Sequence, residues 1–140
     1  MPPDMSNLTM QGTTGCCGAL HPKAAEGLEL FNRGRYFEAH ESLELAWRDE
    51  TGPVRELYRG ILQAAVVYLH ITRGNYAGAV KVYLRSQRWL IPWPETCRGV
   101  NVGQLRRDLD VAIGEVKLLG PERITSFNLS LLKPVAYAGI

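Results

Sequence analysis

The sequence predicts an all-α protein, a single compact bundle of about five helices built from two helical hairpins plus a C-terminal helix. From residue 21 onward, apolar side chains recur with the helical period, and Gly and Pro residues separate the periodic segments. No segment shows the apolar–polar alternation that is typical of a half-buried strand. A chain of 140 residues has the size of one ordinary domain.

The elements can be placed in order from their start and stop signals. Residues 1–20 are rich in Gly, Thr, Ser and Pro and lack periodicity, so we expect a flexible N-terminal tail before a single helical domain over residues 21–140. The third predicted helix is apolar almost all round and should be the central one. Residues 121–140 should be extended and run over the bundle. The predicted helices cover about residues 22–34, 36–49, 53–73, 76–90 and 102–119.

A weak internal repeat supports the two hairpins. The pattern R-G-x-Y-x-x-A occurs at residues 33–39 and again at residues 73–79, an offset of 40 residues. This turn resembles the helix junction of tetratricopeptide repeats, but their period is about 34 residues. A tetratricopeptide-like interaction module is therefore the alternative to a compact ligand-binding domain.

Composition excludes several classes of protein. The 16 Lys and Arg residues nearly balance the 14 Asp and Glu residues, which argues against nucleic-acid binding and against an anionic membrane surface. No secretory signal or membrane-spanning stretch is present in the sequence. Cys16, Cys17 and Cys97 lack metal-finger spacing, so we expect reduced thiols, no disulfide framework and a cytoplasmic location.

Polar side chains on two predicted helices form a candidate ligand site. In the second helix His40, Glu44 and Trp47 are spaced i, i+4 and i+7, which places them along one stripe at the edge of the apolar face. The third helix carries a matching polar stripe, and an antiparallel hairpin would turn the two stripes toward each other. The candidate residues are His40, Glu41, Glu44, Trp47, Arg59, Gln63 and His70.

Two interpretations of this stripe remain open. In the structural one, Glu44 forms an ion pair with Arg59 and the other polar groups hydrogen-bond to their neighbours. In the other, His40 and Glu44 chelate a divalent metal ion, because an imidazole and a carboxylate four residues apart on a helix can reach one ion. The zincin motif H-E-x-x-H lacks its second His here, and no E-x-x-H of the di-iron bundles occurs.

The stretches FNRGRYFEAHESLELAWR and LYRGILQAAVVYLHITRGNYAGAVKVY resemble the bacterial and archaeal family catalogued as domain of unknown function 309. The resemblance covers about residues 31–90, and the family hallmark H-x-x-x-E-x-x-W/Y is matched by His40, Glu44 and Trp47. It implies a compact all-helical fold and a motif for which metal binding has been suggested. It implies no established activity.

The sequence therefore supports two hypotheses about function. The first is a small metal- or ligand-binding protein, with metal-assisted hydrolysis as one form of it, in which a bound divalent ion would activate water. The second is a helical module that binds a protein partner or a second copy of itself, with the polar stripe serving only the architecture. Whether the protein is an enzyme stays open.

Overall fold

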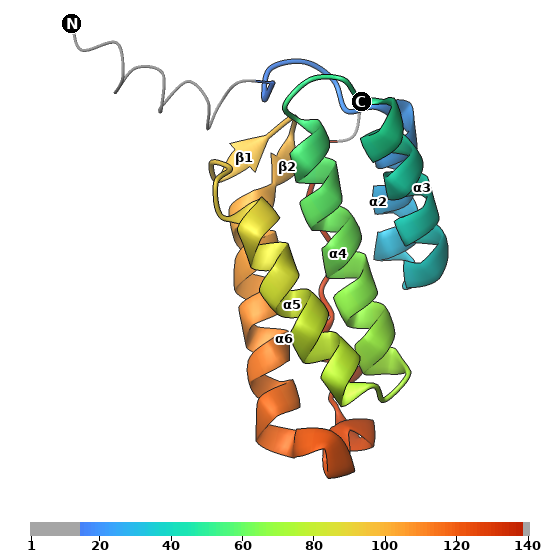
Figure 1. Ribbon diagram of the computed structural model, residues 1–140, viewed down its shortest axis with the longest axis vertical. Helices are drawn as coiled ribbons and strands as arrows, with labels where there is room; N and C mark the ends of the chain where they lie inside the picture. Colours follow the sequence, from blue (N-terminus) through green and yellow to red (C-terminus); the bar gives the residue numbers. More distant parts are fainter. Residues whose placement is uncertain (1–14, 139–140) are drawn as a thin grey trace, which may run out of the picture.

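The computed structural model describes residues 15–138, and the chain within this range is largely helical (Figure 1). The predicted all-α class is confirmed, and the predicted bounds of the second and fourth helices agree with the structure. The five helices of this range are α2 Pro22–Asn32, α3 Tyr36–Asp49, α4 Arg55–Thr72, α5 Tyr76–Leu90 and α6 Val102–Arg123.

Helix α4 lies at the centre of the bundle, as its apolar sequence predicts. It packs between α3 and α5, while α2 packs on α3 and α6 packs on α5 (Figure 1). Helices α4 and α5 approach closely at Gly60, where an added Cβ would lie 2.6 Å from the Cδ2 atom of Leu90. The fully buried side chains of α4 are Leu57, Tyr58, Ile61, Ala64, Ala65, Val67 and Tyr68.

The R-G-x-Y-x-x-A repeat corresponds to two similar turns, before α3 and before α5. Gly34 and Gly74 both adopt the left-handed region, with φ of 77° and 70°, which favours glycine. After the first turn, the ring of Tyr36 packs 5.3 Å from Phe31 and 5.5 Å from Tyr68, measured between centroids. The sequence repeat therefore reflects the same type of turn before α3 and before α5.

A short antiparallel hairpin joins α5 to α6. Strand β1 Thr96–Cys97 pairs with β2 Val100–Asn101. This hairpin is not predictable from the sequence, because strands of two residues are too short to show apolar–polar alternation. Asn101 caps α6, since its Oδ1 accepts a hydrogen bond from the backbone N of Gln104 at 3.0 Å.

The segment after α6 returns along the bundle to the β1–β2 hairpin (Figure 1). A left-handed Gly120 followed by Pro121 kinks the end of α6, and the short 3-10 helices η1 Ile124–Ser126 and η2 Leu129–Leu131 follow. The side chain of Asn32 then makes two hydrogen bonds with the backbone of Val135, of 2.9 and 2.7 Å. The C-terminal segment is thereby fixed to α2.

Only part of the predicted tail can be compared with the structure, because residues 1–14 lie outside the described residues. Residues 15–20, called the strap below, lie against the bundle. Cys16 forms a disulfide with Cys97, so the expectation that these thiols are reduced is wrong for this pair. The pairing joins positions 81 residues apart, and sequence spacing carries no signal for it. No helix within residues 15–138 combines the length and apolar character needed to cross a bilayer.

Candidate functional site between α3, α4 and α5

The predicted stripes of α3 and α4 meet at a pocket, called the Trp47–Arg59 pocket below. Its volume is about 230 Å³, and it opens to solvent between the C-terminal half of α3 and the N-terminal half of α4. Four of the predicted site residues line it, together with one leucine. The lining residues are Glu44, Trp47, Arg59, Leu62 and Gln63.

The guanidinium of Arg59 is the central group of this site. Its Cζ atom lies 4.7 Å from the ring centroid of Trp47 and 4.1 Å from that of Trp89, which comes from α5. Both distances are within the range in which an aromatic ring attracts a cation. Two helices that flank α4 therefore each contribute an indole that holds Arg59.

Glu56 joins these groups at the rim of the pocket. Its Oε1 atom accepts a hydrogen bond from Nε1 of Trp47 at 3.2 Å and lies 3.5 Å from Nη2 of Arg59. Trp47 is held a second time by Arg55, whose Nε donates to the Trp47 carbonyl at 3.3 Å and whose guanidinium lies 4.8 Å from the indole. The indole of Trp47 is therefore held by Glu56 at its N–H group and by Arg55 at its ring.

The predicted ion pair between Glu44 and Arg59 is not formed. The carboxylate of Glu44 instead lies 3.6 Å from Nη2 of Arg48, one helical turn further along α3, and Arg59 pairs with Glu56 within α4. Both observed pairs are local, i to i+4 and i to i+3, so each satisfies a charge within its own helix. Glu44 and Arg59 face the same pocket without sharing a contact in the described structure.

Gln63 brings an acceptor to the pocket that has no partner among the described residues. Its side-chain Oε1 atom is buried and makes no hydrogen bond within residues 15–138. A buried acceptor without a donor costs about 1–3 kcal/mol, so such atoms are rare in proteins. A ligand with a donor group would satisfy it.

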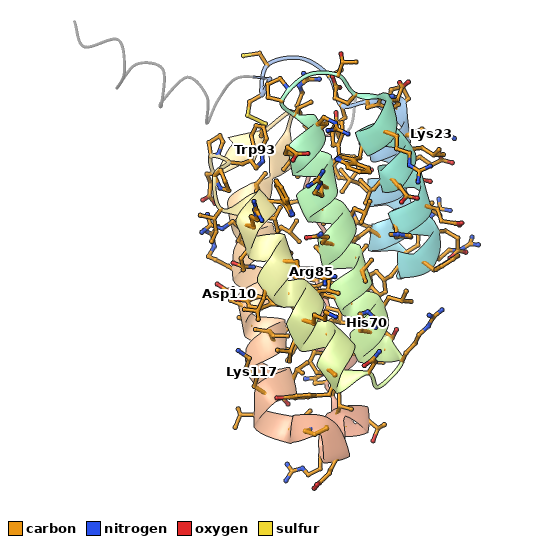
Figure 2. The ribbon with its side chains drawn as sticks, viewed as in Figure 1. Lys23, His70, Arg85, Trp93, Asp110 and Lys117 are labelled. Atoms are coloured by element: carbon orange, nitrogen blue, oxygen red, sulfur yellow. A yellow bond between two sulfur atoms is a disulfide. The ribbon has the colours of Figure 1, made fainter. Side chains whose placement is uncertain are left out.

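The other predicted residues lie apart from this pocket. Glu41 is exposed on α3, and the half-buried ring of His40 packs 6.0 Å from that of Phe37. His70 lies near the C-terminal end of α4 (Figure 2), where its Nδ1 atom is 3.2 Å from Nδ2 of Asn75. Burial and the nearby charge of Arg73 lower the pKa of His70 below its usual value. Two turns of helix separate it from Gln63.

These positions give the metal hypothesis little support. Within residues 15–138, no three His, Cys, Asp or Glu side chains are grouped closely enough to hold a metal ion. Structural and catalytic zinc sites usually need three or four protein ligands. His40 and Glu44 therefore lack the additional ligands that the hypothesis requires from α4.

Trp89 was not among the predicted site residues. Trp89 and Trp93 stand close together in the sequence beside two prolines, a pattern that also fits a loop packed onto the bundle. In the structure the Arg59 guanidinium lies over the Trp89 ring. The Cζ atom of Arg88 lies 5.0 Å from the centroid of the same ring. The position of Trp89 on the last turn of α5 could have indicated this contact, because an up-down bundle places the end of α5 beside the first turns of α4.

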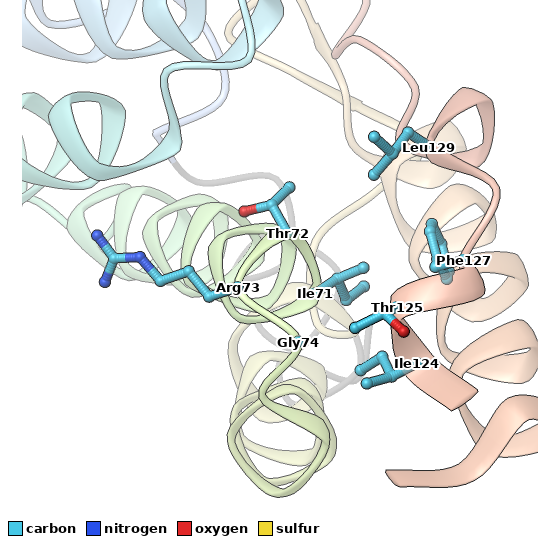
Figure 3. Close-up of a pocket in the computed structure, with 8 residues that line it drawn as sticks. All are labelled: Ile71, Thr72, Arg73, Gly74, Ile124, Thr125, Phe127 and Leu129. Atoms are coloured by element: carbon cyan, nitrogen blue, oxygen red, sulfur yellow. The ribbon is translucent and has the colours of Figure 1, made fainter. Parts of the chain in front are cut away.

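A second cavity lies at the opposite end of α4, where that helix meets η1 (Figure 3). It has a volume of about 250 Å³ and contains none of the predicted site residues. Its walls combine apolar and polar groups, and Arg73 is the charged residue among them. The lining residues are Ile71, Thr72, Arg73, Gly74, Ile124, Thr125, Phe127 and Leu129.

Comparison with known proteins identifies the segment that carries the Trp47–Arg59 pocket. Residues 24–82 match the model of a family described as "Domain of unknown function (DUF309)". This segment is similar to DUF309 domains. The match confirms the resemblance seen in the sequence. The matched segment includes all five residues that line the pocket, but it ends before Trp89.

Two bacterial relatives share parts of the chain. An uncharacterised protein of Aquifex aeolicus is 26% identical over 100 residues, which are 71% of this chain and 30% of that protein. The uncharacterised protein YpuF of Bacillus subtilis is 39% identical over 74 residues, which are 51% of this chain and 42% of YpuF. The chain therefore matches less than half the length of either relative. No solved structure matches it at a significant level.

Proposed function

We propose that this domain binds a small organic oxyanion in the Trp47–Arg59 pocket. Arg59 carries the proposal. Its Cζ atom lies 4.7 Å and 4.1 Å from the centroids of two indole rings, and a guanidinium has five N–H donors along its edge. Among the described residues Arg59 has one ion-pair partner, Glu56, at 3.5 Å. Its side chain is 26% exposed, so an oxyanion from solvent can reach the remaining donors.

The rest of the pocket narrows the ligand class. Leu62 and the indole of Trp47 offer an apolar wall that would contact a short hydrocarbon part. Oε1 of Gln63 is buried, so it would accept a hydrogen bond from a ligand hydroxyl or amine after the amide turns toward the pocket. A carboxylate or phosphate that also carries a donor group, such as a hydroxy acid, therefore fits better than a simple anion. A volume of about 230 Å³ suits a ligand of this size.

Binding is tested by titration of the 15N-labelled full chain at constant ionic strength with lactate, propionate and inorganic phosphate. Lactate and propionate differ by one hydroxyl, which is the group expected to meet Gln63. We expect saturable shifts of the indole N–H signals of Trp47 and Trp89, with lactate binding more tightly than propionate. Uniform small shifts, equal to those caused by chloride, would show that no specific anion site exists.

Arg59→Gln should weaken lactate binding at least about tenfold, which corresponds to ~1.4 kcal/mol for a lost charge-assisted hydrogen bond. Arg88→Gln is the matched control, because Arg88 lies 5.0 Å from the Trp89 ring but does not line the pocket. It removes the same charge and should change the affinity by less than about threefold. Equal losses in the two variants would indicate general electrostatic attraction and refute the site.

Gln63→Leu separates a functional role from a structural one. Replacing a buried unpartnered acceptor by an apolar side chain of similar size should leave the free energy of unfolding unchanged or raise it by about 1 kcal/mol. The same change should remove the preference for lactate over propionate. A clear loss of stability without a change in affinity would assign Gln63 to the architecture.

A helical interaction module is the second candidate. On α3, which packs on α2 and α4, the side chains of Phe37 and Leu45 are 46% and 50% exposed. A protein partner would cover them. Sedimentation of the purified chain, with Phe37→Ser and Leu45→Ser variants, tests self-association through this helix. A monomer at all concentrations would remove the homodimer from this candidate.

A further inference from the structure

The strap is fastened to the β1–β2 hairpin by covalent and hydrogen bonds. Cys16 is disulfide-bonded to Cys97 in β1. The next residue, Arg98, donates from its backbone N to the carbonyl of Cys16 at 2.9 Å. Its guanidinium donates to the carbonyls of Gly15 and Ala19. These contacts hold the strap in one register on the hairpin.

A third cysteine, Cys17, directly follows one half of this disulfide in the sequence. Cys17 is exposed and has a free thiol, whereas Cys16 is half-buried and Cys97 is 1% exposed. A thiol from solvent therefore has poor access to the sulfur of Cys97. Cys17 is already tethered next to the bond, and a tethered nucleophile reacts at a much higher effective concentration than one in solution.

We propose that Cys16, Cys17 and Cys97 form a thiol–disulfide exchange site. The Cys17 thiol first gives its proton to solvent, and its thiolate then attacks the sulfur of Cys97. The Cys16–Cys97 bond breaks, its electron pair leaves on the sulfur of Cys16, and that thiolate takes up a proton. A Cys17–Cys97 bond has replaced the first one without net oxidation or reduction. An external dithiol that donates two electrons and two protons reduces either form to three thiols.

The backbone around the pair permits this exchange. Adjacent Cα atoms are about 3.8 Å apart, so a one-residue slide of the strap brings Cys17 to the place of Cys16. Gly15 and Gly18 flank the two cysteines with φ of 87° and 107°, values that glycine adopts readily and that it can leave without a side-chain clash. The slide would break the hydrogen bonds from Arg98 to the strap. The Cys16–Cys97 form should therefore predominate at equilibrium.

The strap also contacts the turn that leads into α4. A Cβ added to Gly15 would lie 3.4 Å from Cβ of Val54, the residue before Arg55. At the end of the strap, the backbone N of His21 donates to the hydroxyl of Tyr58 at 3.0 Å. Opening the disulfide would therefore loosen the cover over the start of α4, next to the rim of the Trp47–Arg59 pocket. The exchange itself requires no ligand there and is tested separately.

The test uses the full chain and its Cys16→Ser, Cys17→Ser and Cys97→Ser variants, equilibrated in buffers of oxidised and reduced glutathione. Samples are quenched with acid, alkylated and mapped by tandem mass spectrometry that cleaves between residues 16 and 17. The rate of disulfide opening is measured on addition of a small monothiol. Far-UV circular dichroism of each variant shows that the helices are intact.

We expect mainly Cys16–Cys97 in the wild type, with a smaller fraction of Cys17–Cys97. Cys16→Ser should form the Cys17–Cys97 bond, and Cys17→Ser should keep the first bond but open at least about tenfold more slowly. Cys97→Ser is the control that can form neither bond to position 97. The proposal is overturned if Cys17→Ser opens as fast as the wild type, or if folded Cys16→Ser keeps two free thiols under oxidising conditions.

Discussion

Gly60→Ala should push α5 away from α4 and disturb the stacking of Trp89 on Arg59. A Cβ at position 60 would lie 2.6 Å from Cδ2 and 2.9 Å from Cγ of Leu90, and 3.3 Å from the backbone carbonyl carbon of Trp89. Leu90 is fully buried, so its side chain has little room to turn aside. The backbone of α5 must therefore move where it carries Trp89.

The magnitude follows from two opposed effects. Replacing Gly by Ala inside a helix contributes about 0.5–1 kcal/mol of stability. Overpacking of a closely packed contact costs about 1–3 kcal/mol. For Gly60→Ala we expect a net loss of about 1 kcal/mol.

Gly114→Ala is the matched control, since it makes the same change inside α6, where an added Cβ would meet no atom within 4 Å. It should gain about 0.5–1 kcal/mol without a cost. Urea unfolding of both variants, followed by circular dichroism, measures the difference in the free energy of unfolding, expected to be about 1–3 kcal/mol. Tryptophan fluorescence of the native state should change only in Gly60→Ala. If Gly60→Ala is as stabilising as Gly114→Ala, the close approach of α4 and α5 at this position is refuted.

Two further predictions concern polar contacts away from the pocket. Asn32→Ala leaves the backbone N and O of Val135 without partners, so it should cost about 1–2 kcal/mol and accelerate amide exchange at Val135; unchanged exchange there would contradict the clamp. Burial, together with the 2.6 Å hydrogen bond to Asp110, raises the pKa of Tyr83 to about 12. The folded state then holds this proton more tightly than the unfolded state, so the stabilisation is complete below pH ~10 and is lost as the pH rises through about 12. Residue-specific NMR titration of the Tyr83 ring would contradict this by giving a midpoint near 10, and Asp110→Asn should lower the midpoint.

The helices were predictable because each boundary has a local chemical signal. Gly34 and Gly74 adopt positive φ at their turns, and Asn101 caps α6 through its own side chain. The central position of α4 was also predictable, since a helix that is apolar all round must be covered on all sides. These features depend on residues close together in the sequence.

The contacts of the site were less predictable, because they depend on the rotation and rise of neighbouring helices. One of the two interpretations paired Glu44 with Arg59 across the α3–α4 hairpin, yet each of them pairs within its own helix. Helical periodicity places both side chains on facing stripes but does not fix which partner each one reaches. Cys16 and Cys97 pose the same problem on a larger scale, since only the folded chain brings them together.

The position of Arg59 changes how the H-x-x-x-E-x-x-W motif is best understood. The metal hypothesis takes His40 and Glu44 as its functional members and leaves Trp47 as a packing residue. In the structure Trp47 has the more specific contacts, because its indole supports the Arg59 cation and its Nε1 donates to Glu56. Glu44 and Glu56 offset part of the Arg59 charge at the pocket, so the N–H donors of Arg59 that Glu56 does not occupy are the groups that would bind an anion. The tryptophan of the motif would then serve an anion site by holding its arginine, and a Trp47→Phe variant, which keeps a ring but loses the Nε1 donor, should weaken lactate binding less than Arg59→Gln does.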